Sequence, residues 1–213
     1  MNRFAQNLAL LLTFVLESQP AVAVSIVNGG FEEPPIENQS ADFFPTIPGW
    51  TANFGGDIEI QNNVAGSPHG GSQFVELDST ENSGILQSLA TLPGQEYRLS
   101  FFYSPRPGYP RDTNGIEVFF DGLQVASIAE DGTELADTNW SLFTYVVVAS
   151  GSNAPLEFRA TGMSDSLGGY VDDVQFVPEP STLALLALSL PLVWRLAAAG
   201  RSLGPSSAAF LRD

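Results

Sequence analysis

The middle of the chain consists of short runs in which the polar and apolar pattern is that of β-strands. Residues 57–61 alternate polar and apolar side chains and place Ile58 and Ile60 on one side, as in a strand buried on one face. Residues 96–103 and 115–120 are rich in aromatic and β-branched side chains, which favour a pleated sheet. These runs predict strands that cover a hydrophobic core.

Further runs of the same kind follow one another along the chain. The alternation in residues 140–148 places Trp140, Leu142, Thr144, Val146 and Val148 on one side of a strand. Asp121-Gly122 joins two apolar runs, the strongest short signal for a hairpin. Other expected strands lie at residues 25–27, 49–52, 73–78, 85–89, 123–128, 156–160 and 170–176. Residues 33–48 hold four prolines and no period, which predicts a long surface loop. About ten short strands without a helical period predict an all-β sandwich.

The N-terminus has the pattern of a secretory signal peptide. A short positive segment with Arg3 precedes a mostly apolar run, and Ala21-Val22-Ala23 provides small residues at a cleavage site. We therefore expect residues 1–23 to be a signal helix that is removed after Ala23. A retained N-terminal anchor is the alternative, but the apolar run is short.

The C-terminus carries a second hydrophobic segment. Pro178 and Pro180 separate the last strand from an apolar run that begins at Leu183, where Ser181 or Thr182 can cap a helix. Residues 183–199 reach the lower limit for a membrane span, with Pro191 tolerated as a kink. The arginines that follow predict a cytoplasmic tail at residues 202–213. An amphipathic helix packed on the domain is the alternative, although the run has no polar face.

This tail resembles the PEP-CTERM sorting signal of exopolysaccharide-producing Gram-negative bacteria. The resemblance lies at Pro178-Glu179-Pro180-Ser181-Thr182-Leu183, followed by the apolar run and arginines, and covers residues 177–201. The basic cluster is less dense than is usual in that family. The resemblance implies a precursor held transiently in the inner membrane and cut near residues 178–180 by an exosortase-type membrane peptidase. The product would lie at the cell surface or in the extracellular matrix.

Composition narrows the choice of partners. The chain has 24 acidic residues against 8 basic ones, a net charge of −16, and all the basic residues are arginines. Such a chain repels nucleic acid and anionic polysaccharides. The same acidity favours divalent cations, or simply keeps an exported protein soluble. The absence of cysteine excludes disulfides and thiolate chemistry.

The domain at residues 24–176 resembles galactose-binding-like jelly rolls, which include carbohydrate-binding modules. The resemblance rests on five short motifs that occur in the same order as in those domains: Asn28-Gly29-Gly30-Phe31-Glu32, Pro48-Gly49-Trp50, residues 71–78, residues 92–99 and Tyr170-Val171-Asp172-Asp173-Val174. It implies a jelly-roll β-sandwich of roughly eight to ten strands, often with a structural calcium ion and often with bound sugar.

The same resemblance implies a calcium site between the two ends of the domain. Its acidic candidates are Glu32 near the start and Asp172 and Asp173 in the closing strand. Carboxylate oxygens are the ligands that calcium prefers. The alternative is that Asp172, which alternation places inward, accepts hydrogen bonds from nearby main-chain amides instead.

Candidates for sugar binding lie around the proline-rich loop at residues 104–114. Tyr103, Arg106 and Tyr109 are the first choice, with Trp140 after them, because sugar sites combine aromatic faces with polar side chains. Large aromatic residues at strand starts, such as Trp50 and Trp140, are more often part of a core. Tyr109 stands between Gly108 and Pro110 and is the aromatic residue that we expect to be least buried.

Catalysis has little support in the sequence. His69 is the single histidine, and no Gly-x-Ser-x-Gly motif presents a nucleophile. We therefore expect an exported, non-enzymatic protein that binds carbohydrate or exopolysaccharide. The alternatives are a structural or adhesive matrix protein without affinity for sugar and a glycan hydrolase.

Overall fold

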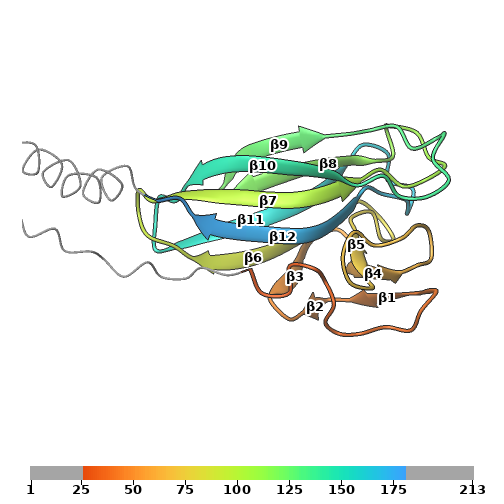
Figure 1. Cartoon of the computed structure of the whole chain (residues 1–213), viewed down its shortest axis with the longest axis horizontal. Coiled ribbons are helices and arrows are strands. Elements are labelled where there is room, and N and C mark those ends of the chain that lie inside the picture. The colour runs from red at the N-terminus through yellow and green to blue at the C-terminus, as the bar shows by residue number, and fades with distance from the viewer. Residues whose placement is uncertain (1–25, 181–213) are drawn as a thin grey trace, which may run out of the picture.

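The computed structural model describes residues 26–180, which form a sandwich of two antiparallel sheets (Figure 1). One sheet, here sheet A, has the strand order β1-β4-β5-β12-β7-β10. Its strands are β1 (Ser40–Phe44), β4 (Ile58–Asn62), β5 (Phe74–Glu76), β12 (Tyr170–Pro178), β7 (Glu96–Ser104) and β10 (Ser141–Val148).

The other sheet, sheet B, has the order β2-β3-β6-β11-β8-β9. Its strands are β2 (Thr46–Ile47), β3 (Trp50–Phe54), β6 (Gly84–Ala90), β11 (Asn153–Thr161), β8 (Gly115–Phe120) and β9 (Leu123–Ile128). The prediction of an all-β sandwich is therefore confirmed, with twelve strands and no helix in the described residues.

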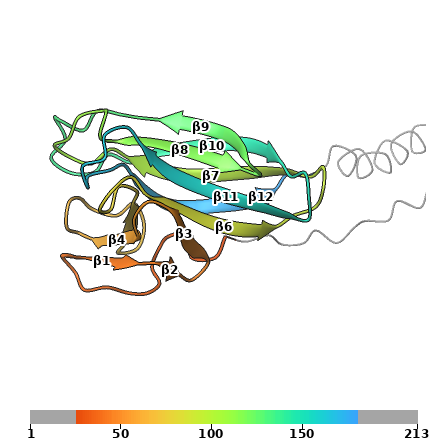
Figure 2. The ribbon, with the colours of Figure 1, turned by 180° about the vertical axis from the view of Figure 1, so that it is seen from behind.

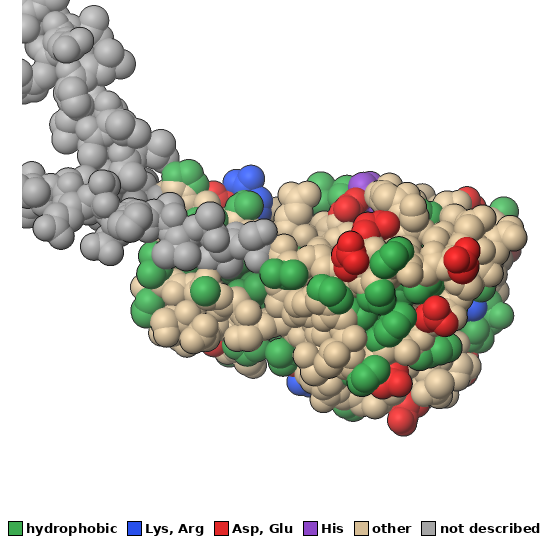
Figure 3. Space-filling view, turned by 90° about the horizontal axis from the view of Figure 1, so that it is seen from below, with side chains coloured by type: hydrophobic (Ala, Val, Ile, Leu, Met, Phe, Trp, Pro, Cys, Tyr) green, Lys and Arg blue, Asp and Glu red, His purple; other side chains and the backbone are tan. Residues whose placement is uncertain are grey.

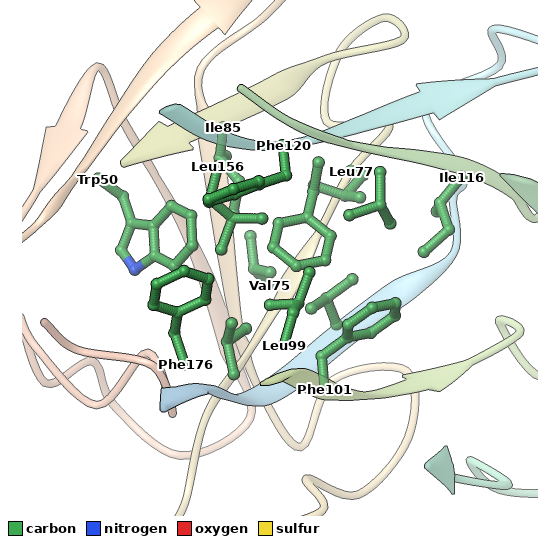
Figure 4. Packing of buried hydrophobic residues seen from close by; sticks show 14 of the residues in the cluster. Trp50, Val75, Leu77, Ile85, Leu99, Phe101, Ile116, Phe120, Leu156 and Phe176 are labelled. Atoms are coloured by element: carbon green, nitrogen blue, oxygen red, sulfur yellow. The ribbon is translucent and has the colours of Figure 1, made fainter. Parts of the chain in front are cut away.

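The core lies between the two sheets and draws side chains from both. Figure 4 shows Phe101 and Phe176 of sheet A facing Trp50 and Leu156 of sheet B, all of them nearly or fully buried. Phe158 links the two layers, with its ring centroid 5.0 Å from that of Phe101 and 6.1 Å from that of Trp50. The inward positions expected at Ile58 and Ile60 are confirmed.

Two expectations at the start of the domain are wrong. Ile26 and Val27 do not lie in a strand, and the expected loop at residues 33–48 contains β1 and β2. Strand β1 is only partly buried, and its residues show no regular alternation of buried and exposed side chains. The sequence therefore gives no sign of a strand within this proline-rich segment. Main-chain pairing with β4 over five residue pairs holds β1 in sheet A.

The sandwich has two different ends (Figures 1 and 2). Five connections meet at one end, here the loop end: residues 63–73, 77–83, 105–114, 129–140 and 162–169. Strand β12 runs away from the loop end, and the Glu179 amide donates to the Glu96 carbonyl at the opposite end. The described chain therefore finishes at the end opposite to its longest loops.

The predicted signal helix at residues 1–23 and the predicted membrane helix at about residues 183–199 lie outside the described residues. Within residues 26–180, no helix has the length and apolar character that crossing a membrane requires.

Replacing Phe158 by alanine is expected to destabilise the domain by about 3–5 kcal/mol, because its buried ring would leave a cavity between the sheets. Phe43→Ala removes the same side chain where it is already about half exposed, and we expect a loss below about 1 kcal/mol. Urea unfolding of both variants measures the difference, and equal losses would contradict the assigned core.

Candidate functional site

The candidate site lies on the outer face of sheet A at the loop end, beneath the loop at residues 63–73. Tyr170 and Phe74 project outward from adjacent strands with ring centroids 4.7 Å apart. The next ring is Trp140, 5.7 Å from Phe74, and its indole N–H donates to the Ser67 carbonyl at 2.9 Å. The Tyr170 hydroxyl donates to the Ala65 carbonyl. These contacts hold the loop over a floor of aromatic rings.

The aromatic band extends in both directions from this floor. On one side, the Arg106 guanidinium lies 5.5 Å from the ring centroid of Tyr109 and 5.9 Å from that of Tyr170. On the other side, the His69 ring stacks on Phe102 and lies 6.2 Å from Trp140. The structure therefore joins the predicted residues Arg106, Tyr109 and Trp140 in one continuous band.

Tyr103 requires a correction, because the structure places its side chain in the core. It has no exposed surface, and its hydroxyl donates to the Asn114 carbonyl and accepts from the Glu130 amide. Its ring cannot stack on a ligand in solution, so the sugar-binding role expected for Tyr103 is wrong. Trp50 is likewise a core residue, whereas Trp140 and Tyr109 are half-buried.

A polar cluster that the sequence did not reveal lies next to the aromatic band. Glu76 has no exposed surface and accepts hydrogen bonds from Arg106 Nη1 at 2.5 Å, from the Gly168 amide at 2.7 Å and from Gln61 Nε2. Gln61 Nε2 also donates to Glu59, whose strand pairs with that of Glu76. Gln61 Oε1 and Arg106 Nε are buried without a partner.

The two carboxylates of the cluster are held in an unfavourable setting. Burial raises the pKa of Glu76 well above its usual value, and the nearby charge of Glu59 raises it further. Burial also raises the pKa of Glu59, although Gln61 and Arg106 oppose this shift. One positive charge, that of Arg106, therefore lies beside two buried acids, a costly arrangement to keep in a fold.

The carboxylates of Asp172 and Asp173 form hydrogen bonds with His69 and Gly70 in the loop at residues 63–73. Asp172 is fully buried, and its carboxylate accepts from the amides of His69, Gly70 and Asp173 at 3.0, 3.1 and 2.7 Å. Burial raises its pKa to about 7, against the lowering effect of these amide hydrogen bonds. Asp173 Oδ2 lies 2.6 Å from His69 Nδ1.

Glu32 binds the last two residues of this loop, Ser72 and Gln73. Its Oε1 accepts from the amides of Ser72 and Gln73 at 2.8 and 3.0 Å. Gly71 has a φ of +59°, and a Cβ there would collide with the Glu32 carboxylate. Glycine is therefore required at position 71 both for the backbone conformation and for this close approach.

The structure brings together the three predicted calcium ligands, Glu32, Asp172 and Asp173, around Gly30. Their carboxylates are engaged by the backbone, since Glu32 accepts two main-chain N–H groups and Asp172 accepts three. No group of three or more acidic or histidine side chains in residues 26–180 is set to hold a metal. The contacts instead match the alternative in which Asp172 accepts from main-chain amides.

A shallow groove opens beside the proline-rich loop. It has a volume of about 410 Å³ and is lined by residues of three of the loops at the loop end, the end of β11 and the start of β8: Pro110, Arg111, Asp112, Gly115, Ala129, Asp131, Thr161 and Gly162. Arg111 closes one side by donating to the Ala129 carbonyl. Tyr109 precedes Pro110 in the chain, so the groove borders the aromatic band.

These features define a two-sheet antiparallel β-sandwich with an aromatic and acidic loop end. The solved structures that resemble it include a Stig cyclase, Fisc, from Fischerella sp. TAU in complex with an indole compound, with a TM-score of 0.53 and 17% identity. A cyclase from the same organism gives 0.56 and 18%, and both matches cover 75% of this chain and 98% of the cyclase. At these identities the likeness shows the fold alone.

The proteins that resemble this chain in sequence differ from those that resemble it in structure. A segment of the multifunctional-autoprocessing repeats-in-toxin of Vibrio cholerae is 32% identical over 143 residues, or 64% of this chain. The corresponding toxin of Vibrio vulnificus is 30% identical over 162 residues, or 75% of this chain. The chain spans only 3% of the length of these relatives. No family model matches it.

Replacing Glu59 by glutamine tests the buried acids. Since both pKa values are raised, the folded state holds protons more tightly than the unfolded chain, and the unfolding free energy falls as pH rises above the usual value of 4.5. Glu59→Gln removes one acid and keeps a hydrogen-bonding side chain. We expect it to match the wild type near pH 4.5 and to exceed it at about pH 8.

The matched control is Glu81→Gln, which removes one negative charge at an exposed position. Chemical unfolding across the pH range measures both variants against the wild type. An equal gain in the control would attribute the effect to net charge alone, and a less stable Glu59→Gln protein at about pH 8 would contradict the cluster.

Proposed function

We propose that this protein is an exported, non-enzymatic module whose loop end binds a neutral glycan. The observation that carries the proposal is the pair of half-buried rings, Tyr109 and Trp140, at the two ends of a band whose middle rings, Tyr170 and Phe74, are buried beside a polar cluster. Carbohydrate sites combine apolar ring faces with a few fixed polar groups. The Arg106–Glu76 pair and the loop contacts hold these groups before any ligand arrives.

The unpaired atoms of the polar cluster favour a hydroxyl-bearing ligand or a water molecule beside it. Arg106 Nε is a donor without an acceptor, and Gln61 Oε1 is an acceptor without a donor. A hydroxyl group donates and accepts at once, so one hydroxyl matches both needs. Both atoms are enclosed, so a ligand would reach them through a bridging water or by displacing the Tyr109 loop.

The net charge of the protein favours one class of glycan as the ligand. The chain carries a net charge of −16, and Figure 3 shows acidic side chains spread over the face that it draws, with few arginines among them. Acidic polysaccharides would be repelled by this surface. A neutral glycan is therefore the ligand class that we propose.

The polar cluster does not support hydrolysis. A glycosidase needs two carboxylates that reach the scissile bond. Glu76 has no exposed surface and is occupied by Arg106, Gln61 and Gly168, so it cannot protonate a substrate. This arrangement favours binding over catalysis.

Export and sorting complete the proposal. The signal at residues 1–23 would direct the chain across the inner membrane, and the tail at residues 177–201 would present it to an exosortase-type peptidase for release to the cell surface or matrix. Mass spectrometry of the mature protein should find a first residue of Val24 and a last residue near 178–180. An intact chain in the cytosol would contradict this route.

Alanine at Tyr109 or Trp140 is expected to weaken glycan binding at least tenfold, because each removes a ring from the binding face. Retention on an array of neutral glycans is the measurement. Phe54→Ala is the control, since it removes a half-exposed ring from sheet B and should leave retention unchanged.

Two results would decide against the proposal. If the wild type is retained on no glycan of a broad panel, the protein is better described as a structural or adhesive matrix component. If the purified domain hydrolyses a glycan, the non-enzymatic assignment is wrong.

A further inference from the structure

Strand β10 forms an edge of sheet A that nothing in the described part of the chain covers. It pairs with β7 on one side, and within residues 26–180 no strand pairs with its other side. Its sequence is Ser-Leu-Phe-Thr-Tyr-Val-Val-Val, eight residues without a charge or a proline. Such an edge presents a row of unpaired N–H and C=O groups that can bind another strand.

The other three sheet edges have features that hinder pairing. Strand β1, at the far edge of sheet A, contains the charged Asp42 and is followed by Pro45. Strand β2 has only two residues. Strand β9 has a register irregularity in its pairing with β8. Charges, short length and bulges are the usual means by which proteins protect their edges, and β10 has none of them.

The hydrogen bonds show which main-chain groups of β10 face outward. Just after the end of β10, the Ala149 amide donates to the Gln95 carbonyl. This residue pair is in register with the β10–β7 pairs, the last of which is Val148 with Glu96. In an antiparallel ladder every second residue bonds to the same neighbour. Residues 143, 145 and 147 therefore bond to β7, and residues 142, 144, 146 and 148 direct their N–H and C=O groups to the open edge.

The side chains at those outward positions are apolar. Leu142 and Val146 are each 59% exposed and Val148 is 52% exposed, all on the outer face of the sheet. The partner strand should therefore be extended, uncharged and apolar on one face.

We propose that the partner is β10 of a second copy of this chain, paired antiparallel about a two-fold axis. Opposed residues in such a ladder have side chains on the same face. Placing Tyr145 opposite Tyr145 of the second copy sets Leu142 opposite Val148 and Thr144 opposite Val146. This register covers all three exposed apolar residues, and the two copies join their sheets into one.

Charge favours this edge for self-association. Each copy carries a net charge of −16, so two copies repel one another over most of their surfaces. The uncharged β10 is the place where they meet with the least repulsion. Association through β10 should strengthen with salt, because salt screens the remaining charges.

The test compares two equivalent substitutions in the full chain, held in a non-ionic detergent. Val146→Lys places a charge at the centre of the edge, whereas Val177→Lys places it at a 47% exposed position on the interior strand β12 of the same sheet. At about 1 M salt, where the Debye length is ~3 Å, sedimentation equilibrium should show a dimer for the wild type and for Val177→Lys. Val146→Lys should weaken the dimer at least tenfold.

Disulfide trapping tests the register, because the chain has no cysteine of its own. Tyr145→Cys should give a covalent dimer under mild oxidation, and Val177→Cys should not. A monomeric wild type, equal weakening by both lysine variants, or cross-linking only through Val177→Cys would overturn the proposal. These results are independent of glycan binding, which lies at the loop end.

Discussion

Two carboxylates hold the loop at residues 69–73 against sheet A, and much of the candidate site depends on them. Asp172 and Glu32 together accept from four main-chain amides of this loop. The remainder of the loop accepts the Trp140 indole and the Tyr170 hydroxyl. Without these contacts the outer face of β4, β5 and β12 would face water, and its aromatic and acidic side chains would not be held in one arrangement.

Covering the outer face of sheet A with this loop has an electrostatic cost. Glu59 and Glu76 occupy positions where alternation alone would leave them in solvent, and the loops above them turn these positions into an interior. Arg106 compensates only one of the two charges, so the cluster is weak evidence for stability. Groups whose pKa values are shifted by burial occur at functional sites as well as in structural ion-pair networks, and this cluster lies beside the aromatic band.

Alternation predicted the strands well because it reports which side of a strand is apolar. It placed Ile58 and Ile60 correctly, and ten of the eleven expected strands overlap observed ones. It could not show that a distant loop covers the other face of β4, so the pattern left Glu59 and Gln61 on the solvent side. Tyr103 has a different explanation: its place beside the proline-rich loop suggested a binding role, although alternation with Leu99 and Phe101 puts its side chain into the core. Arg106, Tyr109 and Trp140 do lie at the loop end, as their loop positions indicated, and their binding role stays a prediction.

The course of β12 gives the molecule an orientation. This strand begins at the loop end, crosses the full sandwich and leaves Glu179 beside Glu96 at the far end. A body attached to a surface through the residues that follow would stand with its aromatic loops outermost and its sheets upright. The edge strand β10 would then run perpendicular to that surface, and its antiparallel partner would point the opposite way, so a pair of copies would join two facing surfaces rather than two neighbours on one surface.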